Sequence, residues 1–259
     1  MSRLAARALV CRRGPRTVLE SIDVAFAADQ VTAIIGPNGS GKTTLLRYLA
    51  GLDRAASGDV ELDGAPLGQL AAGVRARRIA YLPQGASVYW PLLGRDLVAL
   101  GRLPHGADLG RPLSPPDADA VERALRRVDG IAFADRTVDA LSQGERARLL
   151  LARTLATEAD ILLADEPVAS LDPAYALDTM SVLRAEAQRG TCVVVSLHDL
   201  GLAARFADRV IVLAGGRIAA DGRPLEALRP EIIDAAYGVG FRTVTFEGVT
   251  QPVAWSRRP

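Results

Sequence analysis

Short runs of hydrophobic residues, separated by helical patterns, recur along the chain. Residues 31–35 form an apolar, β-branched run that leads directly into a glycine-rich turn, which predicts a buried strand. Leucines at 45, 46 and 49 follow the spacing of a helix and predict one over 43–50. Further strand-like runs lie at 161–164, 192–196 and 210–213, with helical patterns between them. Strands that alternate with helices predict an α/β fold built on a largely parallel sheet.

The pattern changes between about residues 85 and 159. Strand-like runs stop there, and glycine and proline interrupt a helical pattern. A loop at 113–116 precedes a helix that we expect to begin near Asp117. We therefore interpret 86–159 as a helical subdomain that is inserted into the α/β core.

The whole chain, 1–259, is expected to form a single domain. Its α/β core would consist of 1–85 and 160–220, interrupted by the helical subdomain. The remaining residues, 221–259, are expected to form a C-terminal extension. Within it the pattern predicts a short helix and then an alternating patch, at 230–237 and 243–246.

Composition excludes several classes of protein. With 259 residues, 49% of them hydrophobic, the chain is long and apolar enough for a sizeable core, and disorder is not expected. The net charge of +1 argues against binding through phosphate neutralisation, so we expect no nucleic-acid partner. Cys11 and Cys192 lie far apart in apolar contexts, which favours a reducing compartment over a disulfide framework or a zinc site.

The chain is expected to be cytoplasmic unless a partner holds it at a membrane. No apolar run approaches the roughly 20 residues that cross a bilayer. Four arginines interrupt residues 1–13, so this segment lacks the apolar core of a signal peptide.

The chain contains a single lysine, Lys42, beside thirty arginines. A bias in codon usage explains most of this imbalance, but it does not explain why one position kept lysine. The ammonium of lysine is a compact point charge on a flexible stem, whereas the guanidinium of arginine is a rigid planar fork. Position 42 is therefore expected to need the smaller group.

A glycine-rich loop surrounds this lysine. Residues 36–43 match G-x-x-x-x-G-K-[ST] at every fixed position, between a predicted strand and a predicted helix. Glycines let the backbone N–H groups wrap closely around phosphate oxygens, and the helix adds its positive end. We expect Lys42 to reach the β- and γ-phosphates of a nucleotide and the Thr43 hydroxyl to ligate Mg²⁺. The expected nucleotide-binding residues here are Gly36, Pro37, Asn38, Gly39, Ser40, Gly41, Lys42, Thr43 and Thr44.

Two carboxylates end the apolar run at 161–164. Asp165 is a candidate for the magnesium shell, and Glu166 is a candidate for polarising a water that attacks the γ-phosphate. The alternative is a strand that runs into an acidic turn, which is common. Downstream of a phosphate loop in the same α/β core, the pair indicates a P-loop NTPase that uses Mg²⁺.

The segment 141–145 opens a helical run that continues over 146–156. Ser142 and Glu145 have the spacing of a capping box, so a well-capped helix is the simplest interpretation. That interpretation leaves Gly144 unexplained, because glycine in a first helical turn costs about 1 kcal/mol relative to alanine. A glycine that lets a phosphate approach the helix N-terminus accounts for it.

This segment resembles the signature motif of ATP-binding cassette (ABC) ATPases, and its distance from the phosphate loop is similar. The resemblance covers roughly residues 9–222. It implies an α/β fold of ABC ATPase type, a RecA-like P-loop NTPase core with an inserted helical subdomain. Three more motifs follow in the family's order. Gln84 matches the glutamine that contacts Mg²⁺ and the attacking water, 170–172 match a loop that crosses the dimer interface, and His198 matches the histidine that contacts the γ-phosphate.

The chain departs from the family in two places. The signature motif usually contains Gly-Gly-Gln, where this chain has 143–145, Gln-Gly-Glu. The aromatic residue that stacks on adenine would fall near Arg12 or Arg13, and no aromatic stands there. The guanidinium plane of Arg13 can stack on a base instead, but a solvated surface charge explains this residue equally well.

The resemblance also implies partners. In the family two ATPase subunits pair head to tail, each ATP lying between one phosphate loop and the opposite signature helix, so a homodimer is expected. Transmembrane permease subunits and a substrate-binding protein would complete a transporter. The chain would then lie on the cytoplasmic side of the inner or plasma membrane, held by the permease through the helical subdomain and the Gln84 region.

The segment 97–105 narrows the expected function. It resembles a stretch found in ATPase subunits of bacterial importers for iron–siderophore, haem and cobalamin, although a helix stop with glycine and proline explains it as well. His105 is expected to be a surface residue rather than a metal ligand. We expect the ATPase subunit of such an importer. The alternatives are the ATPase subunit of an exporter and a soluble ABC ATPase in translation or DNA repair.

Overall fold

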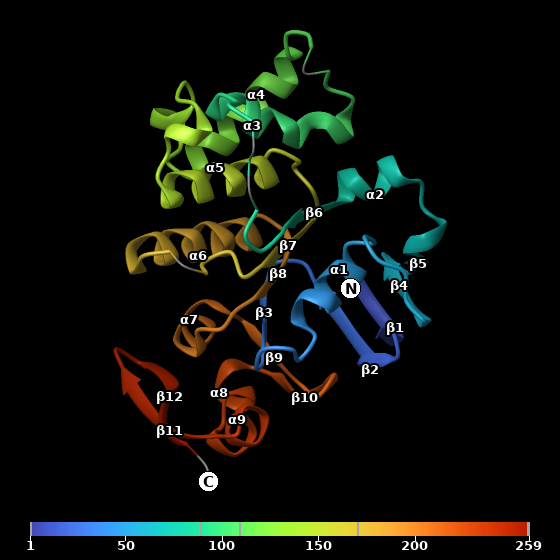
Figure 1. The fold of residues 1–259 in the computed structure, drawn as a ribbon, viewed down its shortest axis with the longest axis vertical. Coiled ribbons are helices and arrows are strands. Elements are labelled where there is room, and N and C mark those ends of the chain that lie inside the picture. Colours follow the sequence, from blue (N-terminus) through green and yellow to red (C-terminus); the bar gives the residue numbers. More distant parts are fainter. Residues whose placement is uncertain (1, 87, 89, 109, 170, 258–259) are drawn as a thin grey trace.

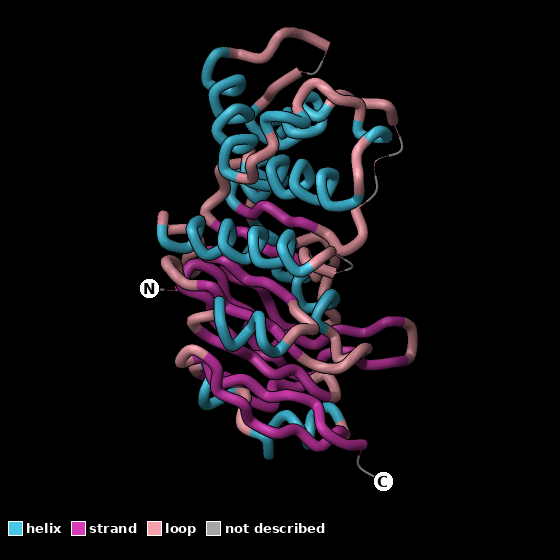
Figure 2. Tube along the Cα trace, turned by 90° about the vertical axis from the view of Figure 1, so that its left-hand side faces the viewer, coloured by secondary structure: helices cyan, strands magenta, loops and turns pink. Residues whose placement is uncertain are grey.

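The computed structural model describes residues 2–86, 88, 90–108, 110–169 and 171–257. Helices α3, α4 and α5 gather at one end of the molecule, the sheets occupy the middle, and the hairpin β11–β12 lies at the opposite end (Figure 1). Figure 2 shows the strands stacked below this helical end.

A six-stranded sheet forms the centre, in the order β10-β9-β3-β8-β7-β6. Strands β6, β7, β8, β3 and β9 are parallel, and β10 runs antiparallel to β9. Three of them, β3, β7 and β8, are buried at every position, because both faces of the sheet are covered. The predicted parallel α/β layer is therefore confirmed. The bounds are β3 (Val31–Ile35), β6 (Ile79–Leu82), β7 (Ile161–Asp165), β8 (Cys192–Ser196), β9 (Arg209–Ala214) and β10 (Arg217–Gly222).

A second, antiparallel sheet with the order β2-β1-β4-β5 was not anticipated by the sequence reasoning. It covers the face of helix α1 (Lys42–Leu49) that the central sheet leaves free, so that Leu9 and Phe26 share a core with Leu45 and Leu49. Its strands are β1 (Ser2–Arg13), β2 (Arg16–Ala27), β4 (Ser57–Leu62) and β5 (Ala65–Pro66), and η1 (Leu67–Gln69) and α2 (Ala72–Arg78) follow.

Helices dominate the segment between β6 and β7. In the part of it that the structure describes, strand-like pairing is limited to one bridge between Leu93 and Thr137. The helix expected near Asp117 begins at Pro115, because the Ser114 hydroxyl caps it by accepting from the Asp117 N–H. The elements are α3 (Gly94–Ala99), η2 (Leu100–His105), α4 (Pro115–Arg127), η3 (Ile131–Phe133), η4 (Val138–Ala140) and α5 (Gln143–Leu155).

The chain returns to the central sheet at β7, after which α6 (Pro173–Gln188) joins β7 to β8 and α7 (Leu200–Phe206) joins β8 to β9. After β10 it continues into α8 (Pro224–Ala227), α9 (Pro230–Tyr237) and the hairpin β11 (Val239–Phe246) and β12 (Val249–Arg257). The helix expected at 230–237 is α9, and the alternating patch lies in β11. Among the described helices, none combines the length and the hydrophobicity that a bilayer crossing requires.

Candidate functional site

A cavity of about 740 Å³ opens at the carboxyl ends of the parallel strands. The loop after β3 forms one wall, while Gln84, Glu166 and His198 follow β6, β7 and β8. Because parallel strands end at the same edge of a sheet, four segments far apart in sequence meet here. The lining residues are Arg13, Arg16, Val18, Asn38, Gly39, Ser40, Gly41, Lys42, Thr43, Thr44, Gln84, Glu166 and His198.

The glycine loop fits tightly between β3 and α1. A Cβ on Gly36 would lie 2.1 Å from the carbonyl oxygen of Leu213, so only glycine is accommodated. Gly41 caps α1 with φ 107°, in the left-handed region that favours glycine. This turn directs the start of α1, with its unpaired N–H groups, toward the cavity.

The ammonium of Lys42 lies inside this loop. The residue is 5% exposed, and Nζ donates to the carbonyl oxygens of Gly36 at 2.9 Å and Pro37 at 3.5 Å. Nζ also lies 3.9 Å from Oε1 of Glu166. Burial lowers the pKa of Lys42, while the carboxylates of Glu166 and Asp165 act in the opposite direction. The loop therefore holds a positive charge where the phosphates of a nucleotide would lie.

Asp165 ends β7 with its side chain almost fully enclosed, at 1% exposure. Oδ1 accepts from the Thr43 hydroxyl at 3.2 Å and from the Ser196 hydroxyl at 2.7 Å, and Oδ2 accepts from the Tyr81 hydroxyl at 3.4 Å. Burial, and after it the charge of Asp165, raises the pKa of Tyr81. The hydroxyl of Thr43 and the carboxylate of Asp165 thus present neighbouring oxygens, which are the ligand type that Mg²⁺ prefers.

Glu166 has an unusual backbone conformation, with φ 49°. Its carboxylate accepts a hydrogen bond from the Gln84 amide and lies against Nε2 of His198, and its own N–H donates to Ser196 Oγ at 2.9 Å. Left-handed backbone costs a residue with a side chain about 1–2 kcal/mol and persists where the surroundings enforce it, which is frequent at functional sites. The strand end therefore turns the carboxylate of Glu166 into the cavity.

Ser196 and Tyr81 belong to this arrangement, but the sequence reasoning did not single them out. Ser196 was counted only as the last residue of an apolar strand, yet its hydroxyl links the side chain of Asp165 to the backbone of Glu166. The sequence feature that could have identified Ser196 is a polar residue at the carboxyl end of a buried strand. The corresponding feature of Tyr81 is weaker, since a tyrosine near a strand end is common.

The residues of the segment 141–145 lie elsewhere. Ser142 caps α5 in the expected capping box, accepting from the Glu145 N–H at 3.3 Å while the Glu145 carboxylate accepts from the Ser142 N–H at 2.8 Å. A Cβ on Gly144 would lie 2.8 Å from the ring of Tyr175. This close approach explains why glycine occupies position 144, in addition to the phosphate access expected from the sequence. Neither Ser142 nor Gly144 is among the described residues that line the phosphate-loop cavity.

A comparison with known protein families decides the identity. Residues 19–169, more than half of the chain, match the family described as ABC transporter. The chain belongs to the ABC transporter family. It is accordingly an ATP-binding subunit of the ATP-hydrolysing type, with the P-loop NTPase fold that the sequence predicted.

Curated relatives in this family are similar over nearly the whole chain. The hemin import ATP-binding protein HmuV of Rhodococcus jostii is 43% identical over 235 residues, covering 91% of this chain and 80% of the relative. The protein of the same name from Pseudomonas fluorescens is 41% identical over 241 residues, covering 91% and 92%.

Solved structures agree on the fold. A metal-chelate type ABC transporter in an inward-facing conformation superposes with a TM-score of 0.85 at 23% identity, covering 98% of both chains. The dimeric structure of a bacterial ABC transporter cassette gives a TM-score of 0.72 at 25% identity, covering 85% of this chain and 98% of the other.

One of the remaining ABC motifs is only partly described. Ser170, in the segment expected to cross a dimer interface, lies outside the described residues, while Asp172 caps α6 by accepting from the Ala174 and Tyr175 N–H groups. Arg13, the candidate adenine platform, is exposed at the end of β1 and lines the cavity.

The importer-like stretch at 97–105 has a structural role in this ABC subunit. A Cβ on Gly101 would lie 2.2 Å from the carbonyl oxygen of Arg153, so η2 packs directly against α5. Arg102 is buried and donates to the Ala156 carbonyl oxygen at 2.7 Å, and His105 Nε2 lies 2.9 Å from that of Thr157. These side chains bind carbonyl groups at the end of α5, where positive charge is favourable. The segment 97–105 therefore does more than end a helix: it holds the carboxyl end of α5, the helix that Ser142 caps.

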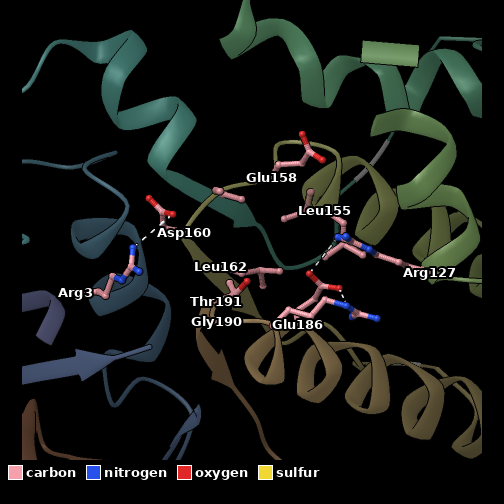
Figure 3. A pocket seen from close by; sticks show the side chains of 13 residues that line it. Arg3, Arg127, Leu155, Glu158, Asp160, Leu162, Glu186, Gly190 and Thr191 are labelled. Carbon is pink, nitrogen blue, oxygen red and sulfur yellow. Dashed lines mark hydrogen bonds and ion pairs between the residues drawn. The ribbon is translucent and has the colours of Figure 1, made fainter. Parts of the chain in front are cut away.

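A second cavity, of about 350 Å³, lies at the opposite, amino ends of β6, β7 and β8 (Figure 3). In it Arg3 pairs with Asp160, and Glu186 lies between Arg127 and Arg189. Each charged residue that lines it has an ion-pair partner: Arg3, Arg127, Glu158, Asp160, Glu186 and Arg189. These charges compensate one another, and the ion pair between Arg127 and Glu186 joins α4 to α6.

Proposed function

We propose that the chain is the ATPase subunit of a bacterial importer for haem or a similar metal chelate. The phosphate loop facing the Glu166 cluster across one cavity carries the ATPase part of this proposal. The relatives named as hemin import ATP-binding proteins, at 41–44% identity over 90% of the chain or more, support the import part. An exporter subunit and a soluble ABC ATPase become outcomes of the test below.

In this proposal the loop residues bind the ATP phosphates through their backbone N–H groups. Lys42 compensates charge on the β- and γ-phosphates from inside the loop. Its ammonium already donates to the carbonyl oxygens of Gly36 at 2.9 Å and Pro37 at 3.5 Å, so it needs little reorganisation. Preorganised charge of this kind is usually the largest single contribution to phosphoryl transfer. Ser142 and Gly144 would contact the phosphates of an ATP held by another subunit.

Glu166 is the proposed general base. The hydrogen bond from Gln84 and the contact with His198 orient its carboxylate, and Ser196 holds its backbone. A water between Glu166 and the γ-phosphate would give its proton to the carboxylate as its oxygen attacks phosphorus, and the bond from phosphorus to the β–γ bridging oxygen would break to release ADP. His198 and Gln84 would position this water and the γ-phosphate oxygens. General base catalysis of this type contributes about 10²- to 10⁴-fold to the rate.

The oxygens at the base of the cavity fit Mg²⁺. Thr43 Oγ1 donates a hydrogen bond to Asp165 Oδ1, and the Gln84 amide donates one to the carboxylate of the next residue, Glu166. Oxygen donors that keep several waters on the ion are typical of nucleotide-bound Mg²⁺. When bound, the ion would neutralise charge on the phosphate oxygens. Thr43, Asp165 and Gln84 are the residues that we propose to hold it.

The separation of Ser142 and Gly144 from the loop cavity supports a homodimeric site. A second copy of the chain would supply the signature helix opposite each phosphate loop, so one chain alone would have an incomplete site. Permease subunits, and a substrate-binding protein outside the cell, would complete the importer. The subunit would then lie at the cytoplasmic face of the membrane.

The variant Glu166→Gln tests the ATPase part. We expect it to bind ATP, to accumulate as a dimer in the presence of ATP, and to lose nearly all turnover, because the amide cannot accept the proton. Gel filtration with ATP and a phosphate-release assay measure both properties. Glu231→Gln, which removes an exposed carboxylate of α9, is the matched control. Normal turnover by Glu166→Gln would overturn the assignment of the base.

Reconstitution tests the import part. The chain would be co-purified with its permease, placed in vesicles and supplied with haem, a ferric siderophore or cobalamin. ATP-dependent accumulation that Glu166→Gln abolishes is the expected result for haem or a related chelate. Movement in the opposite direction would identify an exporter, and failure to associate with any membrane protein would favour a soluble ABC ATPase.

A further inference from the structure

A tyrosine joins the segment after Glu166 to the helix that Ser142 caps. Tyr175 lies in the first turn of α6, and its N–H donates to Asp172 Oδ1 at 3.1 Å, so the cap of this helix fixes its backbone. Its half-buried side chain reaches α5. The ring lies so close to Gly144 that a Cβ added there would be 2.8–3.0 Å from three of the ring carbons.

An arginine one turn further along α5 covers the same ring. The guanidinium carbon of Arg148 lies 4.5 Å from the ring centroid of Tyr175, within the range of a cation–π interaction. Two hydrogen bonds hold this guanidinium in place. It donates to Asp178 Oδ2 at 2.7 Å, one turn along α6, and to the Val128 carbonyl oxygen at 3.0 Å. The Tyr175 ring therefore contacts two successive turns of α5.

Packing of α5 is incomplete around this contact. A cavity of about 540 Å³ is lined by α5 and by the loop that follows β7, with Gln143 and Glu166 among its residues. Another, of about 160 Å³, is lined by α5 and α6 beside Arg148. Closely packed interiors transmit displacements, whereas cavities leave their lining atoms without partners. The contact with Tyr175 therefore carries a larger share of the support for the first turn of α5.

We infer that Tyr175 is a positioning residue for ATP hydrolysis, whose ring sets the place of Ser142 and Gly144 for contact with an ATP held by a second copy of the chain. The inference rests on the proposed homodimeric site. The ring stands on a helix that Asp172 caps, and Asp172 follows Glu166 through a short loop. Within one chain, Tyr175 thus links the proposed base of one site to the residues that would complete the other.

A ring that only fills space predicts something different. Its loss would lower the stability of the chain, and all activities would fall together with the folded fraction. A positioning role leaves nucleotide binding by the phosphate loop intact, because Tyr175 is not among the described residues that line the loop cavity. It weakens only the step in which two chains close around ATP.

The variant Tyr175→Leu removes the ring and keeps an apolar side chain. In the Glu166→Gln background we expect the Kd of the ATP-dependent dimer to rise about fivefold to thirtyfold in analytical ultracentrifugation, the effect of losing a partly desolvated cation–π contact and its packing. ADP lacks the γ-phosphate that the second chain would approach, so its Kd in calorimetry should stay within about twofold. With Glu166 intact, half-maximal ATPase activity should require a chain concentration that is higher by the same factor as the dimer Kd.

Three variants make this test specific. Tyr175→Phe keeps the ring and should dimerise like the parent chain. Arg148→Lys keeps the charge beside Asp178 but loses the stacked plane, so it should weaken the dimer as well, and it supplies the measurement if Tyr175→Leu does not fold. Phe206→Leu is the matched control, because its ring also lies beside an arginine, Arg205, at 5.2 Å, but on α7. It should cost stability and leave the dimer Kd unchanged.

A dimer Kd for Tyr175→Leu within about twofold of the parent would overturn the inference while leaving the proposed function intact. An equal loss in Phe206→Leu or in Tyr175→Phe would do the same, as would an unchanged Kd for Arg148→Lys if Tyr175→Leu does not fold. If Glu166→Gln alone stayed monomeric with ATP, the homodimeric site itself would be refuted, and the inference with it.

Discussion

The variant Ser196→Ala tests whether the hydroxyl at the end of β8 positions Asp165 and Glu166 at the end of β7. Ser196 ends β8 and is completely enclosed. Its hydroxyl donates to Asp165 Oδ1 at 2.7 Å and accepts from the Glu166 N–H at 2.9 Å. One oxygen atom therefore holds the proposed magnesium ligand and the backbone of the proposed base.

The geometry sets the size of the expected effect. Alanine leaves the Glu166 amide without a partner and removes a hydrogen bond to a carboxylate, and together these lower the free energy of unfolding by about 2–4 kcal/mol. Glu166 also loses a contact that enforces φ 49°, so its backbone is free to relax. Because a displacement of 1 Å can cost about 10²-fold in rate, we expect kcat for ATP hydrolysis to fall about 10- to 100-fold.

Urea unfolding and a steady-state phosphate-release assay measure the two effects. Ser181→Ala is the control, because its hydroxyl donates to the Leu177 carbonyl oxygen on an exposed part of α6. That variant should stay within about 0.5 kcal/mol and keep full activity. If Ser196→Ala kept kcat within twofold and stability within about 0.5 kcal/mol, the bridging role of Ser196 would be refuted.

Three further outcomes are expected. Lys42→Arg should weaken ATP binding roughly tenfold or more in calorimetry although the charge is kept, and normal affinity would contradict the steric argument. Glu186→Gln should lower the free energy of unfolding in urea by about 1–3 kcal/mol, a range reduced for the partial exposure of its arginine partners, with ATP affinity unchanged. Because burial raises the pKa of Cys11 to about 11 and that of Cys192 to about 12, neither should react with a thiol reagent in the folded chain at pH 8. The unfolded chain loses these protons from about pH 9, so stability should fall as the pH rises above 9, and rapid native labelling would contradict the assignment.

The central sheet was predictable because its strands are buried on both faces. The runs that became β3, β7 and β8 contain almost only apolar residues, and the loop after β3 has a specific motif. The antiparallel sheet was missed for the opposite reason. Buried and less buried positions alternate only in the second half of β2, and the register between β1 and β2 shifts several times, so the alternation does not extend over a whole strand.

The site was predictable only as far as local motifs extend. Asp165 and Glu166 follow a recognisable strand, and Gln84 and His198 were placed by resemblance. Contacts between elements leave no local pattern. The Ser196 hydroxyl bonds to residues 30 and 31 positions away in the chain.

Lysine and arginine have different tasks in this molecule, and the structure shows a physical reason. At partly exposed carboxylates arginine donates two parallel N–H groups, as Arg47 does to Asp53 at 2.7 and 2.9 Å and Arg209 does to Asp221 at 2.6 Å for both bonds. At position 42 the surroundings are carbonyl oxygens of the loop on one side and a carboxylate at 3.9 Å on the other. A point charge with three rotatable donors satisfies this arrangement and still leaves a donor for phosphate, whereas a planar guanidinium would have to displace Gly36 or Pro37. Every other basic residue besides the two histidines is arginine, but at position 42 the shape of the cation matters more than its charge.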